Sequence, residues 1–124
     1  MQRLNVVVAS SDPSSAARLA ASLHSHFRSV AVARSLEEVR RAIPKHRAQL
    51  AIVDLELADL NDIHELVSEF GQTSVVATHR IPDEEMWALA LAAGAIDCCQ
   101  NADAAGIVQA VSRNLHMAQS NAAA

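Results

Sequence analysis

Short apolar runs alternate five times with longer segments of helical periodicity, and this alternation is the strongest constraint on the fold. The apolar runs cover about residues 4–9, 29–33, 49–55, 73–78 and 95–99. Continuous apolar runs of this length are typical of parallel strands that are buried on both faces. Because helices supply the crossovers that parallel strands need, the pattern predicts a doubly wound α/β sheet of five parallel strands with five helices.

Capping residues and helix breakers mark the expected helix boundaries. Asp12 and Pro13 are a typical N-cap and first residue of a helix, and we expect this helix to bury a stripe formed by Leu19, Leu23 and Phe27. A second helix is expected to begin with a capping box at Ser35 and Glu38 and to stop at Pro44. Three more helices are expected over residues 61–70, ending before Gly71, over residues 82–93, ending before Gly94, and over about residues 103–118.

The chain has the length and composition of a single domain. At 124 residues, 51% of them hydrophobic and 19% charged, we expect one folded domain over residues 1–118 and a frayed tail over residues 119–124. A formal charge of -4 argues against nucleic-acid binding. No apolar run is long enough for a membrane span, so we expect a cytoplasmic protein that does not contact a membrane.

Polar side chains stand at the predicted carboxyl ends of three strands. Ser10 and Ser11 follow the first strand, Asp54 ends the third and Thr78 ends the fourth. In open α/β sheets, ligands bind outside the carboxyl ends of the strands. These residues therefore mark the candidate functional site.

Four segments carry a resemblance to a known family over nearly the whole chain. They read VVVASSDP (6–13), AIVDLELADLND (51–62), VVATHR (75–80) and AGAIDCCQNA (93–102). In order and spacing they resemble the receiver domain of bacterial response regulators, the CheY-like family of two-component phosphorelays. The chain is also similar in this respect to the receiver-like segment of CpaE/TadZ-type pilus-assembly proteins.

The resemblance implies a role for each matching position. Receivers accept a phosphoryl group on an aspartate that ends the third strand, which corresponds to Asp54. A hydroxyl residue, here Thr78, contacts that group, and a lysine neutralises it; Asn101 stands at the lysine position. Two acidic residues after the first strand hold Mg²⁺ in the family, and here they are Ser10 and Ser11.

Loss of these charges predicts a pseudo-receiver that signals through protein contacts. Mg²⁺ is usually held by carboxylates together with phosphate and water, and neutral hydroxyls replace those carboxylates poorly. The alternative is a phospho-accepting receiver, served by a histidine kinase, in which Asp12 or Glu56 holds Mg²⁺ beside Asp54. The resemblance does not imply an enzyme. A flavin or nucleotide enzyme on a similar sheet is disfavoured because the first turn, ASSDPSS, contains no glycine.

Two further positions bear on how a signal would leave the site. Receivers carry an aromatic switch residue on the fifth strand, and Cys98 occupies that position. On the predicted helix over 82–93, we expect Ala88 and Leu91 to face the sheet, which exposes Met86 and Leu89 with Trp87 on the flank. An apolar outer face here predicts a protein partner or a homodimer on the surface of the fourth helix, fifth strand and fifth helix.

Overall fold

The computed structural model describes the main chain of residues 2–123 and the side chains of residues 3–114. Within this range, five strands alternate with five helices. They are β1 Gln2–Ala9, α1 Pro13–Leu23, β2 Phe27–Ala33, α2 Leu36–His46, β3 Leu50–Asp54, α3 Leu60–Glu69, β4 Ser74–His79, α4 Glu84–Ala93, β5 Asp97–Gln100 and α5 Ala104–Ala123. The strands form one parallel sheet in the order β2-β1-β3-β4-β5, which confirms the predicted doubly wound α/β architecture.

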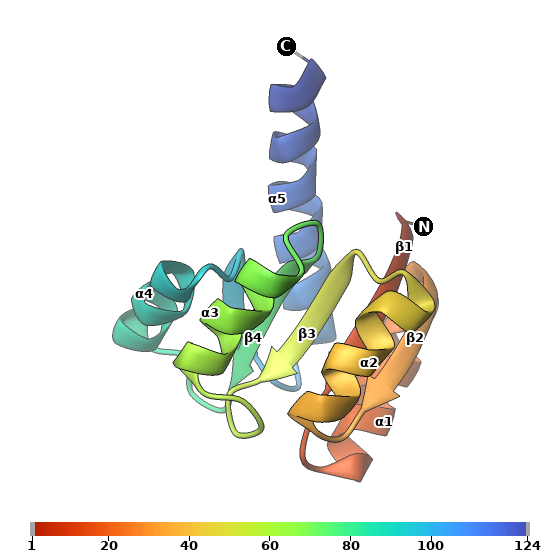
Figure 1. Cartoon of the computed structure of the whole chain (residues 1–124), viewed down its shortest axis with the longest axis vertical. Helices are drawn as coiled ribbons and strands as arrows, with labels where there is room; N and C mark the ends of the chain where they lie inside the picture. The colour runs from red at the N-terminus through yellow and green to blue at the C-terminus, as the bar shows by residue number, and fades with distance from the viewer. Residues whose placement is uncertain (1, 124) are drawn as a thin grey trace.

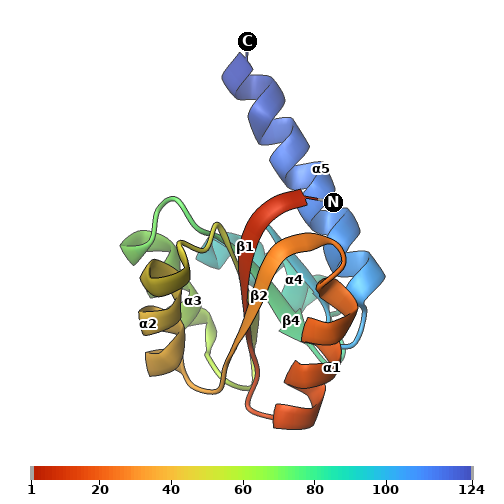
Figure 2. The same ribbon diagram turned by 90° about the vertical axis from the view of Figure 1, so that its right-hand side faces the viewer.

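Helices cover both faces of the sheet (Figures 1 and 2). Helices α2, α3 and α4 pack on one face, around Val39, Ile63 and Ala90, and α1 and α5 pack on the other, around Leu23 and Ile107. Alternate residues of each inner strand point into opposite cores. Both faces of the inner strands are therefore dry, which is why those strands read as continuous apolar runs.

The central strand β3 ends at the candidate site. All five of its residues, Leu50–Asp54, are buried. It lies between β1 and β4, and the register places Asp54 directly beside Thr78. The sheet order therefore brings together two polar side chains that are 24 positions apart in the sequence.

The predicted N-caps of the first two helices are confirmed, but the predicted capping box at Ser35 is incomplete because the Glu38 carboxylate accepts a hydrogen bond from Arg34 N in place of Ser35 N. The Asp12 side chain accepts a hydrogen bond from Ser14 N at 3.1 Å, and Ser35 Oγ accepts one from Glu38 N at 3.1 Å. Each contact satisfies a backbone N–H that has no partner within its helix. These caps fix where α1 and α2 leave the carboxyl ends of β1 and β2.

The prediction that Phe27 belongs to the first helix is wrong. Helix α1 ends at Leu23, and Phe27 is the first residue of β2. Its side chain is nevertheless buried in the same core as Leu19 and Leu23. The four-residue spacing correctly placed the three residues in one core, but it did not show that a turn lies between Leu23 and Phe27.

The prediction that Pro44 ends the second helix is also wrong. Helix α2 continues through Pro44 to His46 and stops at Arg47, which has a left-handed backbone (φ 51°). The carbonyl of Ile43 then accepts hydrogen bonds from Arg47 N and, at 2.9 Å, from Ala48 N. A proline in the last turn removes a single helical hydrogen bond, and the capping turn satisfies the carbonyls that follow.

Helix α5 is longer than predicted. It continues to Ala123, beyond the expected end at residue 118, and extends past the end of the sheet in both views (Figures 1 and 2). The predicted frayed tail over 119–124 is thus helical as far as Ala123, and Ala124 and the side chains beyond residue 114 lie outside the described residues. Within the described part of the chain, no helix is both long and apolar enough to cross a membrane.

Candidate functional site

A small pocket lies at the carboxyl ends of β1, β3 and β4. Ser10, Asp54 and Thr78 line it together with Asn101, which follows β5. Thr78 is 2% exposed, Asp54 6% and Ser10 7%. The structure therefore brings four of the predicted site residues into one cavity, as expected for the carboxyl edge of a parallel sheet.

Asp54 is held by the turn that follows its own strand. Its Oδ1 accepts a hydrogen bond from Glu56 N at 3.0 Å, and its main-chain carbonyl accepts bonds from Leu57 N and Ala58 N. Leu55 N donates to the carbonyl of Thr78 at 2.9 Å, which ties this turn to β4. Asp54 is consequently a fixed carboxylate at the base of the pocket.

Asp12 does not join the pocket. Its carboxylate accepts hydrogen bonds from Ser14 N and, at 2.7 Å, from Ser15 Oγ. The Ser15 hydroxyl and the Ser14 amide lower the pKa of this exposed carboxyl group. The Oγ of Ser10 accepts a hydrogen bond from Asp12 N at 3.2 Å, so Ser10 and Asp12 both stabilise the turn into α1.

Glu56 also points to a partner outside the pocket. Its Oε1 lies 2.9 Å from Nη2 of Arg80, which follows β4. Both side chains are substantially exposed, so the pair contributes little to stability. The two carboxylates that could replace the missing metal ligands are therefore committed to a helix cap and to a surface ion pair.

The residues at the pocket do not fit a magnesium ion. Among the side chains that line it, Asp54 is the single carboxylate, and no Lys or Arg is present. Ser11, the second of the two hydroxyl residues, is exposed and is absent from this lining. Within residues 3–114, no three His, Cys, Asp or Glu side chains are grouped so that they could hold a metal. Mg²⁺ is usually held by one or two carboxylates together with phosphate and water, and this pocket supplies Asp54 alone, so no step here depends on the metal.

Asn101 approaches the pocket through the loop after β5. It is half-buried, and its main-chain N–H donates to the carbonyl of His79 at 3.1 Å. An amide side chain can donate a hydrogen bond to an anion but carries no charge. Asn101 therefore occupies the position expected from the sequence without supplying a cation.

The surroundings of the two adjacent cysteines raise the pKa of both thiols. Burial raises the pKa of Cys98, and the neighbouring Asp97 carboxylate raises it further. Burial likewise raises the pKa of Cys99, to about 12. Since the thiolate is the nucleophile, neither residue is suited to covalent catalysis.

The outer face of α4 is less apolar than predicted. Ala90 is the fully buried residue of this helix, whereas Ala88, expected to face the sheet, is exposed. Met86 is half-buried and packs against the core, so its assignment to the surface is wrong. Trp87 and Leu89 are 46% and 44% exposed, as expected for an apolar outer face. The observed buried face of α4 is therefore rotated relative to the predicted one. The prediction failed because nearly all residues of α4 are apolar, which leaves no clear helical period from which the buried face could be read.

A polar network that the sequence did not reveal joins α4, β5 and α5. Trp87 Nε1 donates to Asp97 Oδ1 at 2.9 Å, and Asp97 Oδ2 lies 3.6 Å from Nη2 of Arg113. Asp97 lies ten positions after Trp87, and Arg113 lies sixteen positions after Asp97, so no short-range spacing in the sequence predicts these contacts. The network holds Trp87 against β5 on the surface where a partner was predicted.

Comparisons with known proteins establish the fold. No family model and no curated protein matches the chain. Solved receiver structures match it closely: CheY in the CheX-CheY-BeF3-Mg²⁺ complex from Borrelia burgdorferi has a TM-score of 0.79 at 16% identity, over 92% of this chain and 90% of that chain. The chain has the receiver fold. The signal receiver domain of a DNA-binding response regulator from Colwellia psychrerythraea gives 0.76 at 12% identity over 91% and 98% of the two chains. That of the putative response regulator NarL from Mycobacterium tuberculosis gives 0.74 at 20% identity over 90% and 94%.

Proposed function

We propose that this chain is a receiver-type signalling module that acts through protein contacts without phosphorylation of Asp54. The observation that supports this proposal is the composition of the pocket. It retains the acceptor and Thr78, but it holds one carboxylate and no cation. The proposal includes no enzymatic activity of the chain itself.

The chemistry of phosphoryl transfer explains why this composition matters. An aspartate that accepts a phosphoryl group gains negative charge, and catalysis of the transfer depends almost entirely on positioning and on neutralising that charge. Removal of one well-placed electrostatic group commonly costs about 3 to 4 kcal/mol in the transition state, or roughly 10²- to 10³-fold in rate. Here Ser10 stands in place of an acidic metal ligand and Asn101 in place of a cation. With two such losses, we expect labelling of Asp54 by a phosphodonor to be slow or absent.

The contact surface that we propose comprises α4, β5 and α5. Trp87 and Leu89 provide its exposed apolar side chains, and the Trp87–Asp97–Arg113 network fixes their orientation. Indole rings that are held in place are typical anchors of protein interfaces because little conformational entropy is lost on binding. A second copy of the chain or another signalling protein would dock here.

The alternative function is a working phospho-accepting receiver supplied by a histidine kinase. Asp54 and Thr78 lie side by side in the register that a receiver requires, which favours it. For it to hold, Asp12 would have to leave the α1 cap, or Glu56 would have to leave Arg80, and hold Mg²⁺ near Asp54.

Intact-mass spectrometry distinguishes the two functions. The chain is incubated with acetyl phosphate or phosphoramidate, with and without Mg²⁺, beside an ordinary receiver as positive control. Asp54→Asn is the matched variant, since its amide oxygen can still accept the hydrogen bond from Glu56 N. We expect no adduct under conditions that label the control. A Mg²⁺-dependent adduct that disappears in Asp54→Asn would refute the proposal and establish the alternative.

Light scattering after size-exclusion chromatography tests the contact surface. Leu89→Glu places a charge at an exposed position of α4 without disturbing the core, and Ala17→Glu is a control at an exposed position of α1, outside the proposed surface. We expect Leu89→Glu alone to abolish self-association or partner binding. Unchanged mass and unchanged partner binding would exclude α4 from the interface.

A further inference from the structure

The formal charge of -4 conceals a strong separation of charge along the chain. Residues 1–50 carry eight Lys or Arg and three Asp or Glu, whereas residues 51–124 carry two and eleven. The first half of the chain includes β1, α1, β2 and α2, and β2 is the edge strand next to β1. The basic residues are therefore gathered toward one edge of the sheet, and the acidic ones toward the other.

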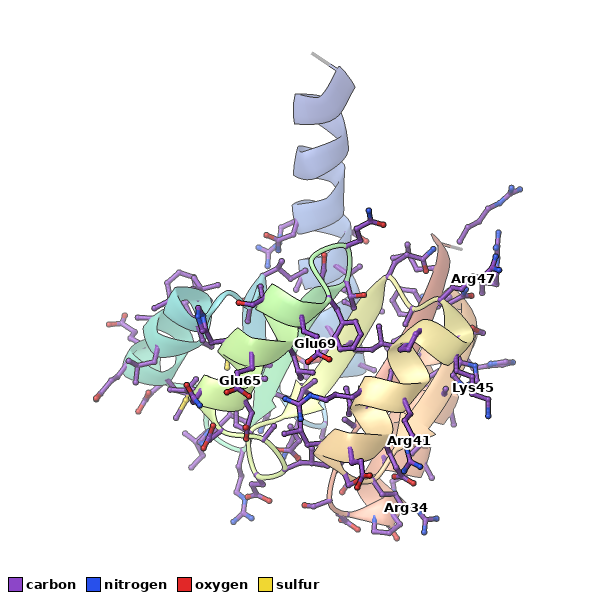
Figure 3. All side chains as sticks on the ribbon, in the orientation of Figure 1. Arg34, Arg41, Lys45, Arg47, Glu65 and Glu69 are labelled. Carbon is purple, nitrogen blue, oxygen red and sulfur yellow. The ribbon has the colours of Figure 1, made fainter. Side chains whose placement is uncertain are left out.

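Four exposed cations follow the outer flank of α2. Arg34, Arg41, Lys45 and Arg47, which we call the basic row, extend from the residue before the helix cap to the residue that ends the helix. Figure 3 shows them along the side of α2 that faces away from α3. Within residues 3–114, none of the four forms a salt bridge.

Arg40 shows the contrast with the inner flank of the same helix. It points toward α3, where Nη2 lies 3.3 Å from Glu65 and Nε lies 3.2 Å from Glu69 (Figure 3). The two α3 carboxylates are thus paired with the inner cation, while the acidic residues in the first turn of α2, Glu37 and Glu38, form no salt bridge with the basic row within residues 3–114. The basic row on the outer flank has no salt-bridge partner among the described side chains, so its charges are available to a binding partner.

A groove and a free strand edge lie beside the basic row. The groove is lined by Val32, Glu38, Arg41, Ala42, Lys45 and His46. Val32 belongs to β2 and is 44% exposed. In the described sheet, β2 pairs with β1 alone, so its outer edge presents main-chain donors and acceptors to solvent. Glu38 is the acidic member of the groove, and its carboxylate accepts a hydrogen bond from Arg34 N.

We propose that the basic row and the edge of β2 bind an extended acidic segment of a partner protein. Such a segment adds a strand to the sheet through main-chain hydrogen bonds, and its alternate carboxylates face the basic row. Helix α2 has 11 residues, or about 16 Å at 1.5 Å per residue, and an extended chain covers that length with about five residues. Two or three carboxylates at alternate positions would therefore match the row.

The charge distribution favours an acidic peptide over a nucleic acid or a membrane. A duplex or a lipid surface extends well beyond the basic row and would meet the repulsion of the acidic half of the chain. A short peptide contacts the row alone, and its alternating main-chain donors and acceptors can pair along the strand edge, a pattern that phosphate groups do not offer. This surface is separate from the α4 surface and from Asp54, so its failure would leave the proposed function intact.

Fluorescence anisotropy with defined peptides tests the proposal. The probe is a fluorescein-labelled peptide of about nine residues in which Glu alternates with Thr. One control peptide has Gln in place of Glu, and another carries N-methyl groups on the central Thr and on the Glu beside it, which removes one main-chain donor from each edge of the peptide. We expect the Glu peptide to bind in low salt, with affinity that falls as salt is raised, and both controls to bind at least about fivefold more weakly.

Matched variants locate the binding site. Arg41→Gln/Lys45→Gln neutralises two members of the basic row, and Arg3→Gln/Arg18→Gln makes the same change of net charge on β1 and α1. All four side chains are exposed, so we expect both proteins to fold, which circular dichroism and urea denaturation will check. The first variant should weaken binding about three- to tenfold and the second less than twofold.

Backbone amide shifts provide the second readout. We expect titration with the Glu peptide to shift the amide signals of β2 and α2 in a ¹⁵N correlation spectrum and to leave α4 unchanged. Equal weakening by the two double variants, or shifts spread over the whole chain, would mean that binding is a general charge effect and would overturn the proposal. It would also be overturned by the absence of binding at millimolar peptide, or by tighter binding to a DNA duplex or to phosphatidylserine vesicles at the same salt.

Discussion

The hydrogen bond between Trp87 and Asp97 gives a quantitative prediction about the α4 surface. Trp87 is the single tryptophan of the chain, and its indole N–H donates to Asp97 Oδ1 at 2.9 Å. The perturbation is a double-mutant cycle of Trp87→Phe, Asp97→Ala and the combined variant. Phe keeps an aromatic ring but removes the donor, so the cycle isolates the hydrogen bond from the packing of the ring.

The expected magnitude follows from burial and charge. A hydrogen bond to a charged group contributes about 1.5 to 3 kcal/mol, and the 46% exposure of Trp87 places this one at or below the lower end, about 1 kcal/mol. The Asp97–Arg113 pair adds little, about 0 to 0.5 kcal/mol, because its atoms are 3.6 Å apart and the Arg113 side chain is 72% exposed. Asp97→Ala should cost about 2 kcal/mol, since Cys98 N also loses its 2.8 Å bond to Asp97.

Urea denaturation followed by circular dichroism measures the cycle, since two of the variants lack the tryptophan. We expect a coupling energy of about 1 kcal/mol between the two sites and a loss of at most about 0.5 kcal/mol in the control Arg113→Gln. A coupling energy below about 0.3 kcal/mol would refute the view that this bond holds α4 against β5. Equal losses in Asp97→Ala and Arg113→Gln would instead assign the effect to the ion pair.

Three further predictions concern the rest of the chain. Gly94→Ala should cost about 2 kcal/mol in urea denaturation, because φ is 112° and the new Cβ would lie 2.9 Å from Val67; a change below about 0.5 kcal/mol would contradict this. Cys99, with a pKa near 12, should react with iodoacetamide at pH 8 far more slowly than in urea, at a rate that still rises with pH beyond pH 10; a plateau near pH 8.5 would show a normal thiol. Phe27→Ala should cost about 3 to 5 kcal/mol, and a surface-like loss below about 1 kcal/mol would contradict its burial at the start of β2.

The sequence was sufficient for the order of elements because the inner strands are buried on both faces and therefore read as continuous apolar runs, and the edge strands are short apolar runs of the same kind. Helix starts were predicted correctly at Asp12 and Ser35, whose side chains make the capping contact, whereas the side-chain caps at Asp59 and Asp83 were not predicted. The end of α1 was missed because Phe27 has the spacing of a helical residue. Its side chain is buried in the core that α1 and β2 share, and burial alone does not distinguish the two elements. The left-handed turn at Arg47 also carries no sequence signal, since glycine is the residue expected there.

The candidate site was predictable in position but not in its contacts. Asp54 and Thr78 were placed correctly because strand ends converge at one edge of a parallel sheet. The partners of Asp12 and Glu56 depended on which neighbours a loop brings within reach, and Arg80 was not anticipated as the partner of Glu56. On α4, an almost uniformly apolar helix gave no period from which its buried face could be read, which is why Met86 was assigned to the surface.

The complete burial of β3 determines how long the Asp54 site keeps its shape. Leu50–Asp54 lie in the middle of the sheet with both ladders paired, so their amide hydrogens should exchange with solvent only through the rarest openings of the molecule. The edge strand β2 and the exposed helix α4 should open far more often. Asp54 therefore ends the strand that should open least often, and the backbone beneath the site should keep its geometry through local openings that expose β2 or α4.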